Sequence, residues 1–269
     1  MSSYVFILCP PYSGSTLLWK LVSTSSAISS LPDEGQFLPE VEKWMRTDHW
    51  GDQTKMPWTE IKKVWDGYWD QDKPLLLEKS PPNILRAREI AKHFDPSYFL
   101  IMVRNPYAHC EGLMRRNKDD AHHAAMFAVR CLRQQMRNAK ELKDTLCFTY
   151  EELARNSAAT AKKIEAFLPQ LGELNYAQTF SLNSIDGVVE RGIVDLNQKK
   201  MRLLSVGDLK IINSVLEKNA DVMDYWGYEA IEPSLRHALS YYGAMTGRFL
   251  SRCVPASVRR GRWRVGQTE

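Results

Sequence analysis

The sequence predicts an α/β protein in which helices cover both faces of a mainly parallel central sheet, giving three layers. Short apolar runs typical of buried strands alternate with segments whose apolar residues recur at helical spacing, over residues 4–22, 74–94, 98–117 and 145–167. Successive strands joined through helices in this way form right-handed crossovers and therefore run parallel. The 269 residues can bury a large core, and 44% hydrophobic and 25% charged residues are ordinary for a soluble globular protein.

Charge and cysteine content narrow the classes of function. The net charge of +4 suits anionic ligands but does not by itself indicate nucleic acid, so we expect no nucleic-acid partner. The five cysteines are scattered and lack the spacing of metal ligands, which favours reduced thiols and no metal site. No stretch approaches the ~20 apolar residues of a membrane span, and the first apolar run lacks the basic segment of a signal peptide. We therefore expect a cytoplasmic protein.

The first predicted strand, turn and helix form a candidate anion site. Residues 4–9 are apolar or favour strands, and Pro10 and Pro11 end that strand. The small polar turn at 12–16 precedes an apolar stripe of helical spacing, so we expect a helix to begin near Ser15. A helix N-terminus after a tight turn directs backbone N–H groups and the positive end of the helix dipole at one point. Such a point favours a phosphate or a sulfate.

This loop differs from the common ATP-binding loop and resembles that of another family. The ATP-binding motif Gly-x-x-x-x-Gly-Lys-Ser/Thr has a lysine after its last glycine, whereas Ser15 follows Gly14 here. Residues 11–16, Pro-Tyr-Ser-Gly-Ser-Thr, instead resemble the first loop of the sulfotransferases that use 3′-phosphoadenosine 5′-phosphosulfate (PAPS), which reads Pro-Lys/Arg-Ser-Gly-Thr-Thr. The resemblance implies a P-loop-type domain whose loop binds this cofactor through Tyr12, Ser13, Gly14, Ser15, Thr16 and Leu17. Taken alone, the loop fits a tight turn without a ligand equally well.

Two charged residues further along match catalytic residues of the family. Glu34 lies in the loop 31–39, shortly before a hydrophobic-proline pair, where the family places its catalytic base. Lys79 ends the apolar strand of 74–81, where the family lysine contacts the sulfuryl group. The resemblance thus implies that both residues are catalytic. Without it, Glu34 could be a solvated loop acid, and Lys79 could pair at the surface with Glu78 or a neighbouring acid.

The strand 98–103 carries the second strong resemblance, to the site of the 3′-phosphate. An Arg-Asn-Pro sequence starting at Arg104 follows it, as in the family. The guanidinium group is a planar, permanently charged fork that matches a phosphate. Eight residues later the family usually has a serine, and Gly112 stands there in this chain. Arg115 or Arg116 on the next helical turn could compensate for the missing hydroxyl.

Later segments complete the predicted cofactor site. The fourth apolar strand leads into Tyr150 and two glutamates, which resembles the family sequence Tyr-Glu-Asp-Leu, whose tyrosine lies near the adenine. A tyrosine packed in the core fits this position nearly as well. The basic stretch 197–205 resembles the late loop that closes over the 3′-phosphate in the family. Its candidate contacts are Lys199 and Lys200, with Arg191 shortly before them.

The insertion at residues 40–72 is rich in tryptophan. One set recurs at helical spacing and should pack in the core: Trp58, Trp65 and Trp69. The insertion lies on the carboxyl-end side of the sheet, where open α/β folds bind ligands. A second set could therefore line an acceptor pocket, since aromatic walls suit a sugar or an aromatic alcohol: Trp44, His49 and Trp50.

We divide the chain into a domain over residues 1–230, a C-terminal helix over 231–251 and a basic tail over 252–269. Residues 225–228 resemble the Leu-Gly-Tyr ending of many domains of the family. The tail combines five arginines with a tryptophan, a composition that suits an anionic membrane surface. A disordered solubilising tail is at least equally plausible.

The sequence therefore predicts a PAPS-dependent sulfotransferase. Four stretches match the family in the right order: 10–22, 31–39, 77–81 and 98–106. The acceptor hydroxyl, on a carbohydrate, a lipid or another small molecule, would lose its proton to Glu34 and attack the sulfur in line. Positioning and cationic side chains would carry the catalysis without a metal ion.

Two alternatives stay open. Tyr12 brings no charge where the family has a lysine or arginine that stabilises the leaving group, and Gly112 lacks a hydroxyl. Both favour a PAPS- or nucleotide-binding module with weakened catalysis, unless Lys20, Lys79 or a lysine of the late loop supplies the charge. The other alternative is an atypical P-loop kinase, against which the missing loop lysine and the lack of a convincing magnesium aspartate weigh.

Overall fold

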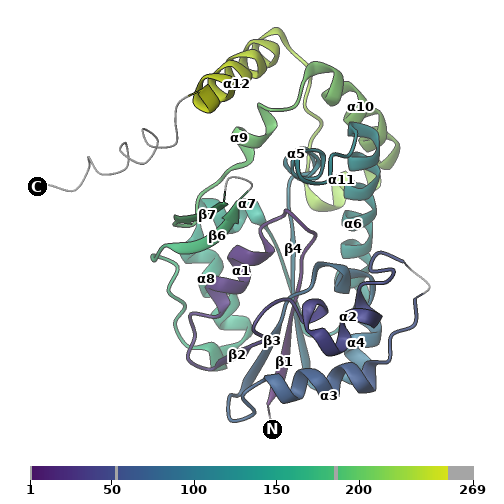
Figure 1. The fold of residues 1–269 in the computed structure, drawn as a ribbon, viewed down its shortest axis with the longest axis vertical. Helices are drawn as coiled ribbons and strands as arrows, with labels where there is room; N and C mark the ends of the chain where they lie inside the picture. Colours follow the sequence, from purple (N-terminus) through teal and green to yellow (C-terminus); the bar gives the residue numbers. More distant parts are fainter. Residues whose placement is uncertain (1, 52–53, 185–186, 254–269) are drawn as a thin grey trace, which may run out of the picture.

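A five-stranded parallel sheet lies at the centre of the molecule (Figure 1). The computed structural model describes residues 2–51, 54–184 and 187–253. The strands of the sheet are β1 (Ser3–Leu8), β2 (Ile28–Ser30), β3 (Leu75–Glu78), β4 (Ser97–Val103) and β5 (Thr145–Thr149). Their order is β2-β3-β1-β4-β5, and every neighbouring pair is parallel. This confirms the predicted sheet and brings the carboxyl ends of all strands to one edge.

Helices pack against both faces of the sheet, which confirms the predicted three layers. One face carries α1 (Ser15–Val22), α7 (Tyr150–Arg155), α8 (Ser157–Phe167) and the antiparallel hairpin of β6 (Phe180–Ser184) and β7 (Gly187–Arg191). The other carries α2 (Pro39–Met45), α3 (Trp58–Tyr68), α4 (Ala87–His93) and the long helix α6 (Ala121–Glu141). Short 3₁₀ helices connect these elements: η1 (Gly35–Phe37), η2 (Pro81–Leu85), η3 (Pro169–Leu171) and η4 (Glu217–Asn219).

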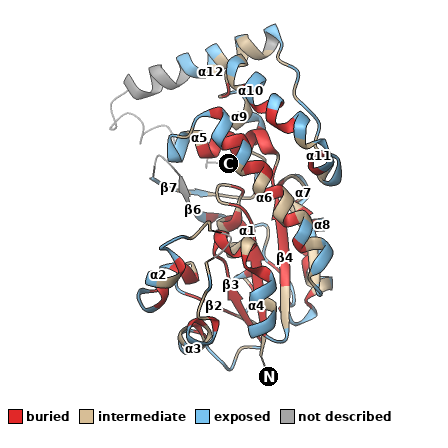
Figure 2. Ribbon diagram, turned by 90° about the vertical axis from the view of Figure 1, so that its right-hand side faces the viewer, coloured by how far each residue is buried: buried red, intermediate tan, exposed pale blue. Residues whose placement is uncertain are grey.

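The strand β1 has apolar side chains on both faces of the sheet, so both faces must be shielded from solvent. Successive side chains of a strand point to opposite faces, and all of those from Tyr4 to Leu8 are buried. The neighbouring strands β3 and β4 are likewise buried over most of their length (Figure 2). Val5 and Ile7 join the core beneath α1, whereas Phe6 and Leu8 join the core beneath α3. A continuous apolar run of this kind is typical of a parallel strand with helices on both sides.

The face beneath α3 has an aromatic core. Trp58, Trp65 and Trp69 are buried there, in agreement with their helical spacing. The ring centroid of Trp65 lies 5.5 Å from that of Phe94, which in turn lies 5.2 Å from that of Phe6. The tryptophan-rich insertion is therefore packed against the central strand and gives the loops around it a rigid support.

A smaller core joins the helices beyond the carboxyl ends of the strands. The helices are α5 (Pro106–Asn117), α9 (Asn197–Met201), α10 (Val206–Leu216) and α11 (Ala220–Trp226), with the first half of α6. α6 packs on α5, α10 and α11, and α9 lies against α5. Together they form a wall on the side of the sheet where its strands end (Figure 1).

Three features were not predicted from the sequence. β2 is a three-residue strand with two serines at the edge of the sheet, so no apolar run marks it. The hairpin of β6 and β7 lies where the predicted pattern weakens, although Phe180 and Leu182 alternate with polar residues and are buried. The helix expected up to residue 167 is broken at Asn156, whose side chain accepts a hydrogen bond from the N–H of Ala159 at 3.1 Å and starts α8.

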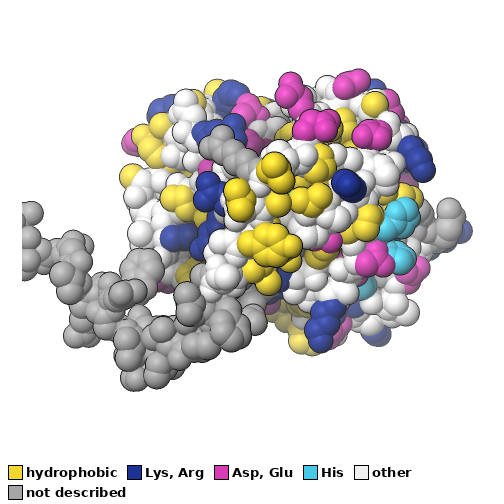
Figure 3. All heavy atoms as spheres, turned by 90° about the horizontal axis from the view of Figure 1, so that it is seen from above, with side chains coloured by type: hydrophobic (Ala, Val, Ile, Leu, Met, Phe, Trp, Pro, Cys, Tyr) yellow, Lys and Arg dark blue, Asp and Glu magenta, His cyan; other side chains and the backbone are white. Residues whose placement is uncertain are grey.

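The last described element is α12 (Leu235–Cys253). Leu235, Leu239 and Tyr242 on this helix are exposed, and apolar side chains gather between scattered charged ones at this end of the molecule (Figure 3). The division into a domain, a C-terminal helix and a tail stays a prediction, and the basic tail 252–269 lies outside the described residues apart from its first two. In the described part of the chain, no helix is both long and apolar enough to span a membrane.

We expect Trp65→Ala to lower the free energy of unfolding by about 3–5 kcal/mol, because a fully buried indole leaves a large cavity when it is removed. Urea unfolding followed by circular dichroism measures the change. Trp44→Ala is the matched control, since Trp44 is only partly buried and should cost less than half as much. Equal losses in the two variants would contradict the assignment of Trp65 to the core.

Candidate active site

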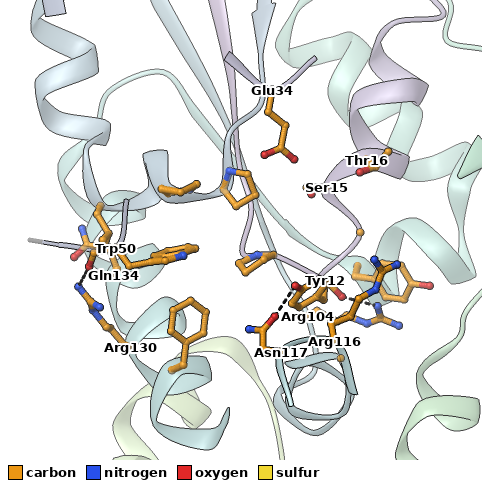
Figure 4. A pocket seen from close by; sticks show the side chains of 18 of the residues that line it. Tyr12, Ser15, Thr16, Glu34, Trp50, Arg104, Arg116, Asn117, Arg130 and Gln134 are labelled. Atoms are coloured by element: carbon orange, nitrogen blue, oxygen red, sulfur yellow. Dashed lines mark hydrogen bonds between the residues drawn. The ribbon is translucent and has the colours of Figure 1, made fainter. Parts of the chain in front are cut away.

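The carboxyl ends of the central strands open into one cleft of about 1940 Å³ (Figure 4). Its walls come from the loop after β1, the loop before α2, and the helices η2, α5 and α6. Residues 191–196 and Lys200 of α9 close the remaining side. The cleft thus lies at the edge where open α/β sheets bind ligands.

The loop between β1 and α1 forms one end of the cleft. Gly14 has a φ of +98°, a conformation that favours glycine, and a Cβ atom there would meet the ring of Tyr150 at 2.8 Å. Gly14, Ser15 and Thr16 line the cleft, whereas Ser13 is buried beneath the turn. The first N–H groups of a helix have no partners within it, so the start of α1 offers donors and a positive dipole end to an anion.

The side chain of Tyr12 is bound to α5. Its phenol donates a hydrogen bond to the Oδ1 of Asn117 at 2.7 Å (Figure 4). The residue at the family's lysine or arginine position therefore supplies no charge to the loop. Neither Lys20 nor Lys79 is among the residues that line the cleft.

Arg104 is a buried cation at the end of β4. Its Nη1 donates to the carbonyl of Tyr12 at 3.1 Å, and its Nε donates to the Oδ1 of Asn197 at 2.8 Å. The guanidinium carbon lies 3.9 Å from the ring centroid of Tyr150. Burial lowers the pKa of Arg104, but an arginine stays charged in proteins. Its Nη2 is buried and has no hydrogen-bond partner among the described residues, which leaves the N–H groups of this nitrogen for a ligand.

Tyr150 connects this cation to the late segment. Its hydroxyl donates to the carbonyl of Val194 at 2.9 Å and accepts from the N–H of Leu196 at 3.3 Å. The side chain is buried, yet it also lines the cleft. The sequence predicts it near the adenine, and the structure places it between the loop at Gly14, Arg104 and the segment before α9.

Two residues that the sequence did not single out orient Arg104. Asn197 accepts from Arg104 and donates through its amide to the carboxylate of Glu151. Glu151 also accepts from the N–H of Asn105 at 3.0 Å and from the hydroxyl of Tyr228 at 3.0 Å. The position of Glu151 directly after a strand end was the available signal. Asn197 had none, because its contact depends on how α9 packs.

Gly112 and Lys200 meet where the family usually has a serine. A Cβ atom at Gly112 would lie 2.9 Å from the Nζ of Lys200 and 2.9 Å from the Cβ of Tyr12. The ammonium group of Lys200 thus lies beside the position of the missing side chain, 3.2 Å from the Oε2 of Glu111. Burial lowers the pKa of Lys200 to about 8. Lys199 is exposed and does not line the cleft, so its role stays a prediction.

Glu34 and Lys79, predicted as the catalytic pair, form an ion pair. The side chain of Glu34 is 17% exposed and lines the cleft, whereas that of Lys79 is 6% exposed and lies behind it. The amide of Gln36 donates to the second oxygen of Glu34. This geometry gives a carboxylate that faces the cleft and is held from both sides, as a positioned base requires.

Glu78, which the sequence suggested as a surface partner for Lys79, is instead buried beneath the Glu34 loop. It accepts hydrogen bonds from the N–H of Gly35 at 3.0 Å, from the amide of Asn83 at 2.7 Å and from the hydroxyl of Ser80. Burial raises its pKa to about 7. The contact with Gly35 fixes the backbone next to Glu34, so Glu78 positions the candidate base.

Aromatic side chains line the other end of the cleft. The ring centroids of Trp50 and Phe127 are 4.7 Å apart in an edge-to-face arrangement, and His49 also lines this end. Trp44 does not line the cleft. Two of the three residues predicted at an acceptor pocket therefore line the cleft, and their role toward an acceptor stays a prediction. Phe127 of α6 was missed because its helical spacing alone did not show which face the cleft would meet.

The structure brings most of the predicted site residues together. Those that line the cleft are Tyr12, Gly14, Ser15, Thr16, Leu17, Glu34, Arg104, Gly112, Tyr150 and Lys200. Those outside its lining are Ser13, Lys79 and Lys199. For both groups of residues, the role toward a ligand stays a prediction.

We expect the pH dependence of stability to change in Glu78→Gln. The pKa of Glu78 is raised from 4.5 to about 7, so the folded protein holds a proton there that the unfolded chain loses above pH 4.5. The resulting stabilisation is present below about pH 4.5 and is lost as the pH rises through 7. Relative to the wild type, the variant should gain up to about 3 kcal/mol in free energy of unfolding between pH 4.5 and 8.

Urea unfolding at pH 4.5 and at pH 8 measures this gain in the free energy of unfolding. Glu60→Gln, a change at an exposed residue of α3, is the control. A difference between Glu78→Gln and the wild type that is the same at pH 4.5 and 8 would contradict the assignment.

Comparison with known proteins identifies the family of the chain and supports its fold. The model of the sulfotransferase family matches residues 4–170. A sulfotransferase domain from the curacin biosynthetic pathway is similar in structure, with a TM-score of 0.55, 16% identity and coverage of 86% of this chain and 99% of that one. This likeness supports the fold. A sulfotransferase from Alicyclobacillus acidocaldarius has a TM-score of 0.48, 13% identity and coverage of 81% and 96%.

Mouse sulfotransferase SULT7A1 complexed with PAP has a TM-score of 0.42, 15% identity and coverage of 78% of this chain and 67% of that one. No curated protein sequence matches the chain significantly. The family model covers more than half of the chain, from β1 to the second residue of η3. The chain belongs to the sulfotransferase family.

Proposed function

We propose that the protein transfers the sulfuryl group of PAPS to a hydroxyl group of an acceptor. The observation that carries this proposal is the buried Nη2 of Arg104, which has no partner in the described residues and lies in a cleft with the start of α1. A buried donor on a cation is costly unless an anion completes its hydrogen bonds. A ligand with two separate anionic groups would satisfy both Arg104 and the helix N-terminus.

The residues present fit PAPS, which supplies the sulfuryl group and the leaving phosphate. The start of α1 would hold the 5′-phosphosulfate, and Arg104 with Lys200 would hold the 3′-phosphate. Lys200 would replace the family's serine hydroxyl by a charged donor, since its Nζ lies beside Gly112. Tyr150, already stacked on Arg104, would border the adenine.

Glu34 would remove the proton from the acceptor hydroxyl as the oxygen attacks sulfur. The new S–O bond forms while the bond from sulfur to the 5′-phosphate oxygen breaks, and that oxygen keeps the electron pair. Lys79 would hold Glu34 in place and offset negative charge that develops on the transferring group. Glu34 is bonded to both Lys79 and Gln36, which favours precise positioning.

One observation favours a second candidate function, that of a nucleotide-binding protein which transfers the sulfuryl group only slowly. The phenol of Tyr12 is held by Asn117 and contributes no charge where the bond to the leaving group breaks. The loss of a charged contact to the leaving group at this position could cost about 2–4 kcal/mol of transition-state stabilisation. Binding without turnover would distinguish this candidate.

We expect 3′-phosphoadenosine 5′-phosphate (PAP), the desulfated product, to bind the wild type in isothermal titration with micromolar affinity. Arg104→Lys keeps the charge but loses the fork, and Lys200→Gln loses a charge, so each should weaken binding by about 10- to 100-fold. Because the pKa of Lys200 is about 8, its ammonium group is lost as the pH rises from 7 to 9. PAP affinity should therefore fall over this range in the wild type and much less in Lys200→Gln.

Lys210→Gln, on the exposed face of α10, is the matched control and should bind PAP like the wild type. ATP should bind more weakly than PAP because it has no 3′-phosphate for Arg104 and Lys200. PAP binding that is absent, or equal in the wild type and both site variants, would refute the proposed cofactor site.

We expect Glu34→Gln to lower turnover by about 10²–10⁴-fold without changing PAP affinity by more than about threefold, because it removes a general base but no cofactor contact. PAP release from PAPS, measured by chromatography in a screen of phenolic and carbohydrate alcohols, gives the rate. Glu40→Gln on α2 is the control, since Glu40 is exposed and does not line the cleft. Unchanged turnover in Glu34→Gln would remove this residue as the base.

A further inference from the structure

The cleft holds more positive charge than the proposed cofactor site uses. Nine arginines and lysines line its described part against three acidic residues, although the whole chain carries a net charge of only +4. Five of the nine belong to the cofactor end: Arg104, Arg115, Arg116, Arg191 and Lys200. The other four are Arg88 of α4 and three arginines of α6: Arg130, Arg133 and Arg137.

The three arginines of α6, which we call the α6 arginine row, share one face of the helix. Their spacing of three and four residues aligns them, and Gln134 lines the cleft on the same face. Arg130 donates to the carbonyl of Trp50 at 2.7 Å. Arg133 bonds both oxygens of Asp221, at 2.7 and 3.0 Å. These contacts fix Arg130 and Arg133 in place.

Arg137 gives the row its available charge. It is exposed at the cleft, and in the described ranges no hydrogen bond or ion pair engages its guanidinium group. Nearby, Arg88 pairs with Glu141, and Asp221 balances Arg133. The fork of Arg137 therefore remains open toward the cleft, and arginine binds carboxylate, sulfate and phosphate groups through two parallel hydrogen bonds.

The row and the cofactor site lie at opposite ends of the cleft. In Figure 4, Trp50, Arg130 and Gln134 lie at one end, Arg104 and Arg116 at the other, and Glu34 between them in this view. Trp50 and Phe127 border the row with an aromatic wall. An acceptor whose hydroxyl lies at Glu34 would extend along this wall toward the arginines.

We propose that the acceptor is an anion, whose carboxylate, sulfate or phosphate group binds the α6 arginine row at Arg137 while its hydroxyl lies at Glu34. The inference rests on the proposed function, because it assumes that the other end of the cleft holds PAPS. The row attracts an anionic acceptor and discriminates against a neutral one, which leaves Arg137 without a partner. Since the group at Glu34 reacts and the group at Arg137 does not, the row sets specificity rather than chemistry.

Two matched probe pairs test the proposal on wild-type protein saturated with PAP. One pair is 4-hydroxyphenylacetate and its neutral amide, and the other is a galacturonate trisaccharide and its carboxyl-reduced counterpart. Ligand-observed NMR titration measures their affinities. We expect the acid to bind about tenfold or more tightly than its neutral partner in at least one pair, which also shows whether the anion belongs to an aromatic or a sugar acceptor.

Variants of Arg137 test whether this residue causes the preference for the acidic probe. Arg137→Gln should reduce the affinity of the acid about fivefold or more and leave that of the neutral probe unchanged, Arg137→Glu should abolish the preference, and Arg137→Lys should keep most of it. Arg202→Gln, at an exposed arginine outside the cleft, is the matched control and should behave like the wild type. Because Arg137 is exposed, these changes should leave the fold intact.

The absence of a preference in both pairs, or a preference that survives in Arg137→Glu, would overturn the inference. PAP titration of the same samples separates this result from failure of the proposed function. Intact PAP binding without an acid preference overturns the inference alone, whereas absence of PAP binding overturns the proposed cofactor site and the inference with it.

Discussion

The guanidinium group of Arg104 is a positive charge that the fold buries before any ligand binds. Its Nη1 holds the carbonyl of Tyr12, its Nε holds Asn197, and its face lies on the ring of Tyr150. Segments far apart in the sequence therefore meet on one side chain at the end of β4. A buried charge with an unused donor lowers the stability of the folded protein while the site is empty. An anion that binds only the folded protein would raise that stability. The positions of the loop at Tyr12, of Tyr150 and of Asn197 are tied together by this one side chain.

The departures from the family pattern are linked in space. Gly112 leaves room that the Cβ of Tyr12 and the Nζ of Lys200 approach closely, so a serine at this position would collide with both. The lysine brings a charge where the pattern has a hydroxyl, while Tyr12 is bound to Asn117. The loss of charge at the loop and the gain of charge beside Gly112 are thus parts of one rearrangement. In the proposed site this rearrangement would strengthen binding of the 3′-phosphate, while Lys79 stays ion-paired with the candidate base.

Much of this arrangement could be predicted from the sequence, and the limits have a physical cause. Long apolar runs such as that of β4 identified most strands, and the carboxyl end of β4 identified Arg104, because parallel order brings such ends to one edge. Glu34 was identified from the family resemblance, since no apolar run marks β2 before it. The burial of Glu78 could not be predicted, since it depends on how the loop at Gly35 packs over the strand. The short polar strand β2 and the contact between α9 and Arg104 likewise depend on tertiary packing.

In the proposed complex, a single nucleotide spans the start of α1 and the Arg104–Lys200 pair. A crystal structure of the protein with bound PAP tests it most directly. We expect the 5′-phosphate at the backbone of Gly14 to Thr16 and the 3′-phosphate bonded to the Nη2 of Arg104 and the Nζ of Lys200. A nucleotide bound elsewhere, or one whose 3′-phosphate leaves Arg104 without an anionic partner, would contradict it.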